Sequence, residues 1–104
     1  MSNNIDLQKI ADELEFDLED VEMLLEVFIE SADESLELLQ NGIQNNDYDT
    51  IFKAAHAIKG SAANLTLDDI SQVAKTLESE ARNSTDFNYQ GSFDQLNLLI
   101  NNLK

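Results

Sequence analysis

Apolar residues recur every three or four positions between residues 21 and 43, and this spacing constrains the fold more than any other feature of the chain. It is typical of a helix with one buried face. The 104 residues contain no proline and three glycines, so residues that break helices are scarce. The pattern therefore predicts a long helix that ends near residue 44. Its core-facing residues are Val21, Leu25, Phe28, Ala32, Leu36, Leu39 and Ile43.

A capping pattern marks the start of this long helix. Asp17 is the predicted N-cap, and Asp20 three residues on makes a variant of the capping box. Phe16 and Val21 flank these residues as a hydrophobic staple. Three further apolar residues lie off the core face, and we expect them to pack under a first helix or along a neighbour, with an exposed docking patch as the alternative. These residues are Met23, Val27 and Leu38.

Shorter helices are predicted on both sides of the long one. The first covers residues 5–14, and a third helix begins at Asn46 or Asp47 and runs to about Asn64. The first helix has Asn3 or Asn4 as its cap and Ile5, Ile10 and Leu14 as inner residues, and the third places Tyr48, Ile51, Phe52, Ala55, Ile58, Ala62 and Leu65 toward the core.

The remainder of the chain predicts two more helices. Thr66 is the expected N-cap of the fourth, with Asp69 at its third helical position, and this helix ends near Arg82. The last helix starts either after Asn88 or at Ser92, and both starts remain open. The inner faces are Ile70, Val73, Ala74, Leu77 and Ala81 in the fourth helix, and Tyr89, Phe93, Leu96, Ile100 and Leu103 in the last.

Four apolar helix faces joined by short turns predict an all-α fold. We expect an antiparallel up-down four-helix bundle with a short additional N-terminal helix. A chain of this length is expected to form a single domain over residues 1–104. The Met1 start and the absence of a linker favour a stand-alone protein over a domain cut from a longer one.

The net charge of −15 is unevenly distributed along the chain. Residues 1–50 carry 15 acidic groups and one lysine (net −14), whereas residues 51–104 carry six acidic and five basic groups (net −1). Nucleic acid and anionic membranes are therefore unfavourable partners. The sequence has no cysteine, no apolar run long enough for a membrane span and no signal peptide pattern. We expect a cytoplasmic monomer.

The single histidine, His56, lies in the third predicted helix within a run of small residues. Lys53 precedes it by three positions, and Lys59, Gly60 and Ala63 follow at i+3, i+4 and i+7, so all five share one stripe of the helix. Glycine inside a helix costs about 1 kcal/mol relative to alanine. The pattern therefore indicates that something needs close approach beside His56.

The long helix is predicted to contribute small residues to the surroundings of His56. The short turn at residues 45–47 makes the second and third helices antiparallel neighbours. Counting back across this turn brings Ser31 and Ser35 to the level of His56, where they would leave room around the imidazole.

The run His56-Ala57-Ile58-Lys59-Gly60 resembles the phosphoacceptor motif of histidine-containing phosphotransfer (HPt) domains, His-x-x-Lys-Gly. The resemblance extends through residues 61–65 to Leu77-Glu78 and, in length and helix order, to the whole chain. It implies a phosphoryl carrier and not an enzyme. His56 would accept the phosphoryl group at Nε2, Lys59 would stabilise its charge, and Gly60 would let the partner approach.

The implied partners are response-regulator receiver domains or a hybrid histidine kinase, which would bring the acidic pocket and Mg²⁺. This chain itself would bind no cofactor and no metal. From their positions on the stripe and across the turn, Lys53, Ala63, Ser31 and Ser35 are candidates for the surface around the acceptor. One departure is Thr66, which stands where many HPt sequences have a glycine ten residues after the histidine.

Other functional classes fit the residues less well. The main alternative is a non-catalytic HPt-like module that binds a receiver or kinase without accepting phosphate. A metal-binding bundle would have one histidine, no cysteine and no Glu-x-x-His pair, because position 53 is a lysine. A hydrolase would need a Ser or Cys partner for His56 that the spacing does not provide.

Overall fold

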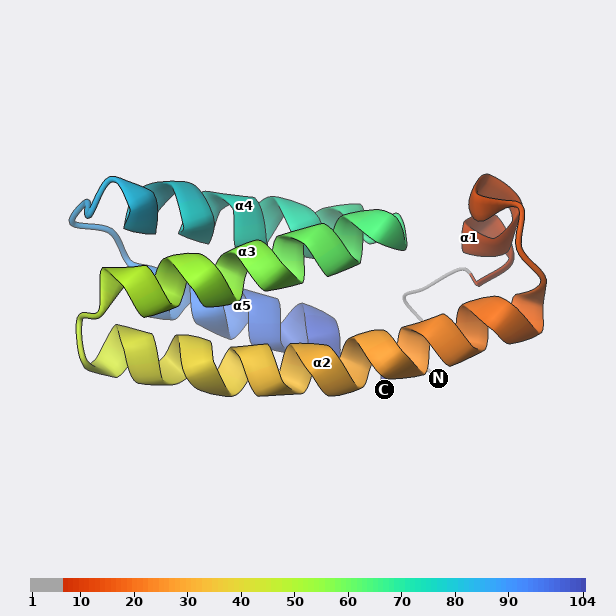
Figure 1. Cartoon of the computed structure of the whole chain (residues 1–104), viewed down its shortest axis with the longest axis horizontal. Coiled ribbons are helices and arrows are strands. Elements are labelled where there is room, and N and C mark those ends of the chain that lie inside the picture. The colour runs from red at the N-terminus through yellow and green to blue at the C-terminus, as the bar shows by residue number, and fades with distance from the viewer. Residues whose placement is uncertain (1–6) are drawn as a thin grey trace.

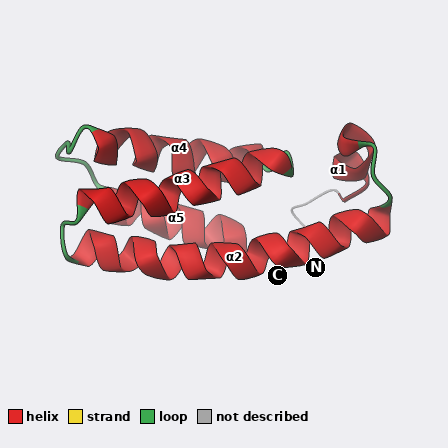
Figure 2. Cartoon of the chain, in the orientation of Figure 1, coloured by secondary structure: helices red, strands yellow, loops and turns green. Residues whose placement is uncertain are grey.

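The computed structural model describes residues 7–104, and it is built from five helices joined by short turns (Figures 1 and 2). The predicted roles of Asn3, Asn4 and Ile5 lie outside the described residues. No helix among residues 7–104 combines the length and apolar character needed to cross a membrane. The helices are α1 (Leu7–Leu14), α2 (Leu18–Gln44), α3 (Tyr48–Asn64), α4 (Asp68–Arg82) and α5 (Tyr89–Asn101).

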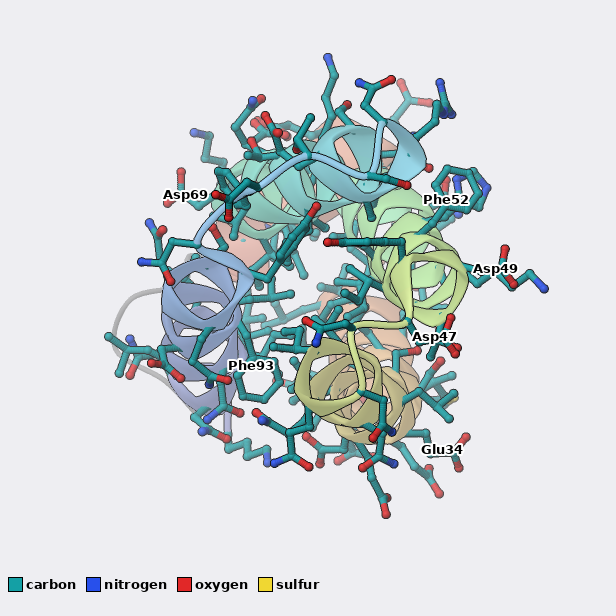
Figure 3. All side chains as sticks on the ribbon, turned by 90° about the vertical axis from the view of Figure 1, so that its left-hand side faces the viewer. Glu34, Asp47, Asp49, Phe52, Asp69 and Phe93 are labelled. Atoms are coloured by element: carbon teal, nitrogen blue, oxygen red, sulfur yellow. The ribbon has the colours of Figure 1, made fainter. Side chains whose placement is uncertain are left out.

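Four helices form a closed ring around one core, and the predicted bundle is confirmed. Each of α2, α3 and α4 packs on the next helix, α5 packs back on α2, and α1 packs on α2. Figure 3 looks along the bundle and shows side chains filling the space between the four ribbons. The largest fully buried side chains are Val21, Leu25, Leu39, Ile51, Ile58, Leu77, Leu96 and Ile100.

Helix α2 is much longer than its neighbours. It has 27 residues against 17 in α3, a difference of about 15 Å at 1.5 Å per residue. The N-terminal part of α2 therefore projects past α3 and α4 toward α1 (Figure 1).

The prediction that the off-stripe residues of α2 are packed is wrong. The exposed fractions of Met23, Val27 and Leu38 are 63%, 61% and 55%. The physical reason is that the helix contacts the core along one face, and these residues lie on another. Phe16, expected to form a staple with the buried Val21, is also 48% exposed.

The helices α1 to α4 end in the same way, with a residue in the left-handed region. The φ angles of Glu15, Asn46, Thr66 and Ser84 lie between 51° and 58°. At the end of α3, Thr66 N–H donates to Ala63 O and Leu67 N–H donates to Ala62 O. This double hydrogen bond is a Schellman motif, which satisfies the last carbonyl groups of a helix.

The predicted role of Thr66 as an N-cap is therefore wrong. The Thr66 amide donates its hydrogen bond to a carbonyl at the end of α3. The N-cap of α4 is Leu67, so Asp69 is the second residue of that helix and not the third. The starts of two other helices are settled by side-chain caps. Asp47 accepts a hydrogen bond from Thr50 N–H at the start of α3, and Asn88 accepts one from Gly91 N–H, so α5 begins at Tyr89.

Candidate functional site

The imidazole of His56 lies in the middle of α3 on the side that faces α4. Its side chain is 62% exposed, as expected for an accessible acceptor. The nitrogen Nδ1 is hydrogen-bonded to the Glu78 carboxylate oxygen Oε2 of α4. Because an ionised carboxylate only accepts hydrogen bonds, Nδ1 carries the proton in this contact. The lone pair of the neutral ring is then on Nε2.

Glu78 is the centre of the site and was not predicted from the sequence. Its side chain is only 5% exposed, and its second oxygen, Oε1, accepts a hydrogen bond from Lys59 Nζ at 2.6 Å. Burial by itself raises the pKa of this carboxyl, but the hydrogen bonds and charges of Lys59 and His56 outweigh burial and hold the pKa below the ordinary value of glutamate. The group is therefore an anion held between two nitrogen donors.

One sequence signal for Glu78 exists. It lies four residues after Ala74 and three before Ala81, both of which are buried in the inner face of α4. A carboxylate at an inward position of a helix requires a partner. The identity of that partner depends on how α3 and α4 pack, which spacing along one helix does not reveal.

An aromatic ring extends the site by one helical turn. Phe52 of α3 stacks on His56 with 6.0 Å between the ring centroids and 14° between the planes. The guanidinium carbon of Arg82 of α4 lies 5.2 Å from the Phe52 centroid. Figure 3 places Phe52 at the outer edge of the α3–α4 pair. Arg82, Phe52, His56 and Glu78 thus form a chain of contacts along the α3–α4 pair.

Gly60 lies on open surface. No described atom outside its own stretch of helix is within 4 Å of the position that a Cβ would take. The fold therefore does not need a glycine here, in contrast to Gly42, where a Cβ would lie 3.1 Å from Ile51 Cγ1. Ala63, one turn further along α3, is also exposed.

The remaining predicted residues lie away from the Glu78 contact. Lys53 pairs with Asp49 at 3.0 Å, and both side chains are more than 70% exposed. Ser31 and Ser35 belong to α2, whereas His56 is bonded to α4. Their role around the acceptor stays a prediction. Within residues 7–104, no group of three His, Cys, Asp or Glu side chains is placed to hold a metal ion.

Comparisons with known proteins identify a family and a similar fold. A family model described as "Hpt domain" matches residues 23–104. The crystal structure of histidine-containing phosphotransfer protein B (HptB) from Pseudomonas aeruginosa PAO1 superposes with a TM-score of 0.83, covering 99% of this chain and 90% of that one. At 21% identity this similarity establishes a shared fold. A search of curated proteins gave no match.

Proposed function

Because the chain belongs to the Hpt domain family, whose members carry phosphoryl groups in phosphorelays and are not catalysts, we propose that His56 is its phosphoacceptor. The observation that carries the proposal is the Nδ1 contact with Glu78. It leaves Nε2 as the nucleophilic nitrogen of an exposed ring. We further propose that residues 1–104 act as one domain, since α1, which precedes the matched range, packs on α2.

The proposed step is a displacement at phosphorus. The Nε2 lone pair attacks the phosphorus of an aspartyl phosphate in a receiver domain. The bond between phosphorus and the aspartyl oxygen breaks, the aspartate leaves as a carboxylate, and an Nε2–P bond forms. The ring then carries positive charge, which Glu78 stabilises through the retained Nδ1 proton. The reverse step delivers the phosphoryl group to another receiver.

Lys59 has two roles in this proposal. In the resting site it holds the buried Glu78 as an anion. Its side chain is 30% exposed and one turn from His56, so its ammonium is placed to stabilise negative charge on the phosphoryl oxygens as well. Phosphoryl transfer depends chiefly on such positioning and charge.

Gly60 and the residues around it form the approach for the partner. The open surface above Gly60 admits a closely fitting protein, and Ala63 continues this low surface by one turn. We propose that Lys53, Ser31 and Ser35 form the outer part of the same surface and contact the partner there. The receiver would supply the acidic pocket and Mg²⁺.

Transfer from phosphorylated receiver domains in the presence of Mg²⁺ tests the proposal. Wild type should acquire a label that is labile in acid and stable in alkali, and His56→Gln should acquire none while remaining folded. Binding of a receiver without any label on wild type would favour the non-catalytic module. A label on His56→Gln would place the acceptor elsewhere.

A pair of lysine variants provides a matched control. Lys59→Met should slow transfer by about tenfold or more, because a charge near the phosphoryl oxygens is lost. Lys75→Met removes the same charge from an exposed position of α4 and should leave the rate nearly unchanged. Equal effects of the two variants would show that only net charge matters.

A further inference from the structure

An exposed apolar row runs along α2. Met23, Val27 and Leu38 are more than half exposed, and Leu24 is 39% exposed. Leu24, Leu38 and Gly42 are 14 and four residues apart, which places them on one line of the helix. Gly42 packs against Ile51 of α3. Leu24 and Leu38 therefore lie on the flank of α2 next to α3. Met23 and Val27, one residue before and three residues after Leu24, lie on the adjoining outward side of the helix. We call Met23, Leu24, Val27 and Leu38 the apolar row.

The N-terminal half of the apolar row lies beyond the end of α3. Since α2 is ten residues longer than α3 and the two are joined by a short turn, the part of α2 before about residue 28 has no α3 beside it. Figure 1 shows this part projecting toward α1. Met23 and Val27, on the outward side of this part of α2, are exposed and thus open to a partner.

A row of carboxylates borders the apolar row. Glu19, Glu26, Glu30 and Glu37 follow at intervals of seven, four and seven residues, so they share one line of the helix, and all are exposed. Glu34, labelled in Figure 3, points outward from the same helix. The 27 residues of α2 include eight acidic residues and no Lys or Arg. The border is therefore anionic with no compensating cation on α2.

Small residues connect this surface to the acceptor. Ala57, Gly60 and Ala63 are exposed along the outer side of α3, between the apolar row and the flank of α3 on which His56 meets Glu78. A partner seated over His56 can cross α3 without meeting a large side chain there. The apolar row is therefore continuous with the proposed transfer surface.

We propose that the apolar row and its carboxylate border select the partner receiver, by accepting an amphipathic helix whose apolar stripe is flanked by Lys and Arg. This inference rests on the proposed function and adds the chemistry of the partner surface. A second copy of this chain is a poor occupant, because each copy carries −15 and would bring carboxylates against carboxylates. A basic partner is instead attracted before contact, and salt weakens the attraction.

The apolar row is tested with a double variant, Met23→Ser with Val27→Ser, which changes exposed residues only. The probe is the receiver domain that transfers fastest to wild type in the assay above. We expect its affinity to fall by about tenfold or more, the effect of losing central apolar contacts. Leu98→Ser, at an α5 residue that is 62% exposed, is the matched control and should stay within about twofold of wild type.

The carboxylate border is tested by charge reversal. Glu26→Lys with Glu30→Lys should slow association with the same receiver by about fivefold or more and flatten its salt dependence. The control, Asp69→Lys with Asp86→Lys, changes the net charge equally at exposed sites outside α2 and should have a much smaller effect. Equal effects of the two pairs would overturn the basic-partner assignment.

A small phosphodonor separates this inference from the proposed function. Phosphoramidate needs no docking surface, so it should label His56 equally in wild type and in the α2 variants. Normal receiver transfer to the Met23/Val27 variant would overturn the inference and leave the proposed function standing. No transfer to wild type from any receiver would overturn both. A wild-type dimer that becomes monomeric in this variant would assign the row to a second copy and also overturn the inference.

Discussion

At the scale of single residues, the site depends on one buried carboxylate with two partners. Glu78 receives a hydrogen bond from His56 through one oxygen and from Lys59 through the other. A buried charge is costly unless it is paired. His56 and Lys59, which lie on the same stripe of α3, provide that pairing together. Orientation of the imidazole and stability of the α3–α4 contact are thus parts of one arrangement.

Glu78→Gln tests the contribution of this charge through pH. At pH 7 the variant should be less stable by about 2 kcal/mol, because hydrogen bonds to a charged group are lost. The folded protein lowers the pKa of Glu78, so its stabilisation is present above the unfolded value of 4.5 and disappears as pH falls through the lowered folded pKa. Urea unfolding of both proteins between pH 7 and pH 3 measures the difference, and a constant difference would contradict the assignment.

Gly60→Ala tests whether the glycine serves the fold or the surface. A Cβ at this position meets open space, so alanine should stabilise the helix by about 1 kcal/mol. Gly60→Glu should keep the fold but slow transfer, because its side chain stands in the approach. Thermal melts and the transfer assay check the two parts.

Gly42→Ala is the matched control for Gly60→Ala. A Cβ at Gly42 would lie 3.2 Å from the backbone nitrogen of Ile51, so α2 and α3 must shift apart to admit it. We expect Gly42→Ala to melt at a lower temperature than Gly60→Ala. The reverse order would mean that Gly60 has a structural role.

The positions of His56, Lys59 and Gly60 on one stripe could be predicted because they depend only on the helical repeat. The contact of His56 with Glu78 could not, because the two residues are 22 positions apart on different helices. Counting residues back across the turn from α3 to α2 predicted instead that Ser31 and Ser35 lie near His56. The side chain of His56 meets α4, the neighbour on its other side.

At the scale of helices, the chain ends four of them without glycine. Glu15, Asn46, Thr66 and Ser84 adopt the left-handed conformation, which glycine takes most easily and asparagine takes better than most other residues. Thr66 is the least suited of the four, since its branched Cβ is crowded there. A glycine at this position would remove the crowding.

Thr66→Gly is therefore expected to stabilise the protein. The gain should be about 1 kcal/mol, because relief of the left-handed conformation exceeds the entropy cost of glycine, and the melting temperature should rise by about 4–8 °C. Thr76→Gly, the same change inside α4, should lower the melting temperature. A fall with Thr66→Gly would mean that the threonine side chain contributes contacts worth more than the strain.

The predicted ends of three helices, near Gln44, Asn64 and Arg82, agree with the structure, whereas the predicted starts depended on which residue provides the cap. Asp47 and Asn88 cap α3 and α5 through their side chains, which is chemistry that is local in sequence. Thr66 followed by Asp69 has the spacing of a cap, but the Thr66 amide is already bonded to Ala63 O at the end of α3. Where two helices are joined by so short a turn, one residue can fit both the end of the first helix and the N-cap of the second. Its hydrogen bonds determine which of the two roles it has.

At the scale of the whole molecule, charge opposes compactness. The chain carries −15, and most of the excess lies in its first half, where α2 has eight acidic residues and no basic one. Self-repulsion of this kind destabilises a folded state. Lys104, three residues after the end of α5, pairs with Asp33 of this acidic helix at 3.1 Å.

Salt should therefore stabilise the protein. Screening weakens repulsion among the exposed carboxylates more than it weakens the partly buried pairs at Glu78. We expect the melting temperature to rise by about 4 °C or more between 10 mM and 300 mM NaCl, equivalent to about 1 kcal/mol. A melting temperature that falls over this range would show that attractive surface pairs dominate.

The closed ring of helices also bears on how quickly the protein finds its fold. The pairs α2–α3, α3–α4 and α4–α5 are neighbours in the chain, and only the α2–α5 contact joins distant segments. Three helical hairpins can therefore form by closing short loops, which costs little entropy. Only the meeting of α5 with α2 requires a long loop to close. Such a topology has low contact order, so we expect refolding within milliseconds.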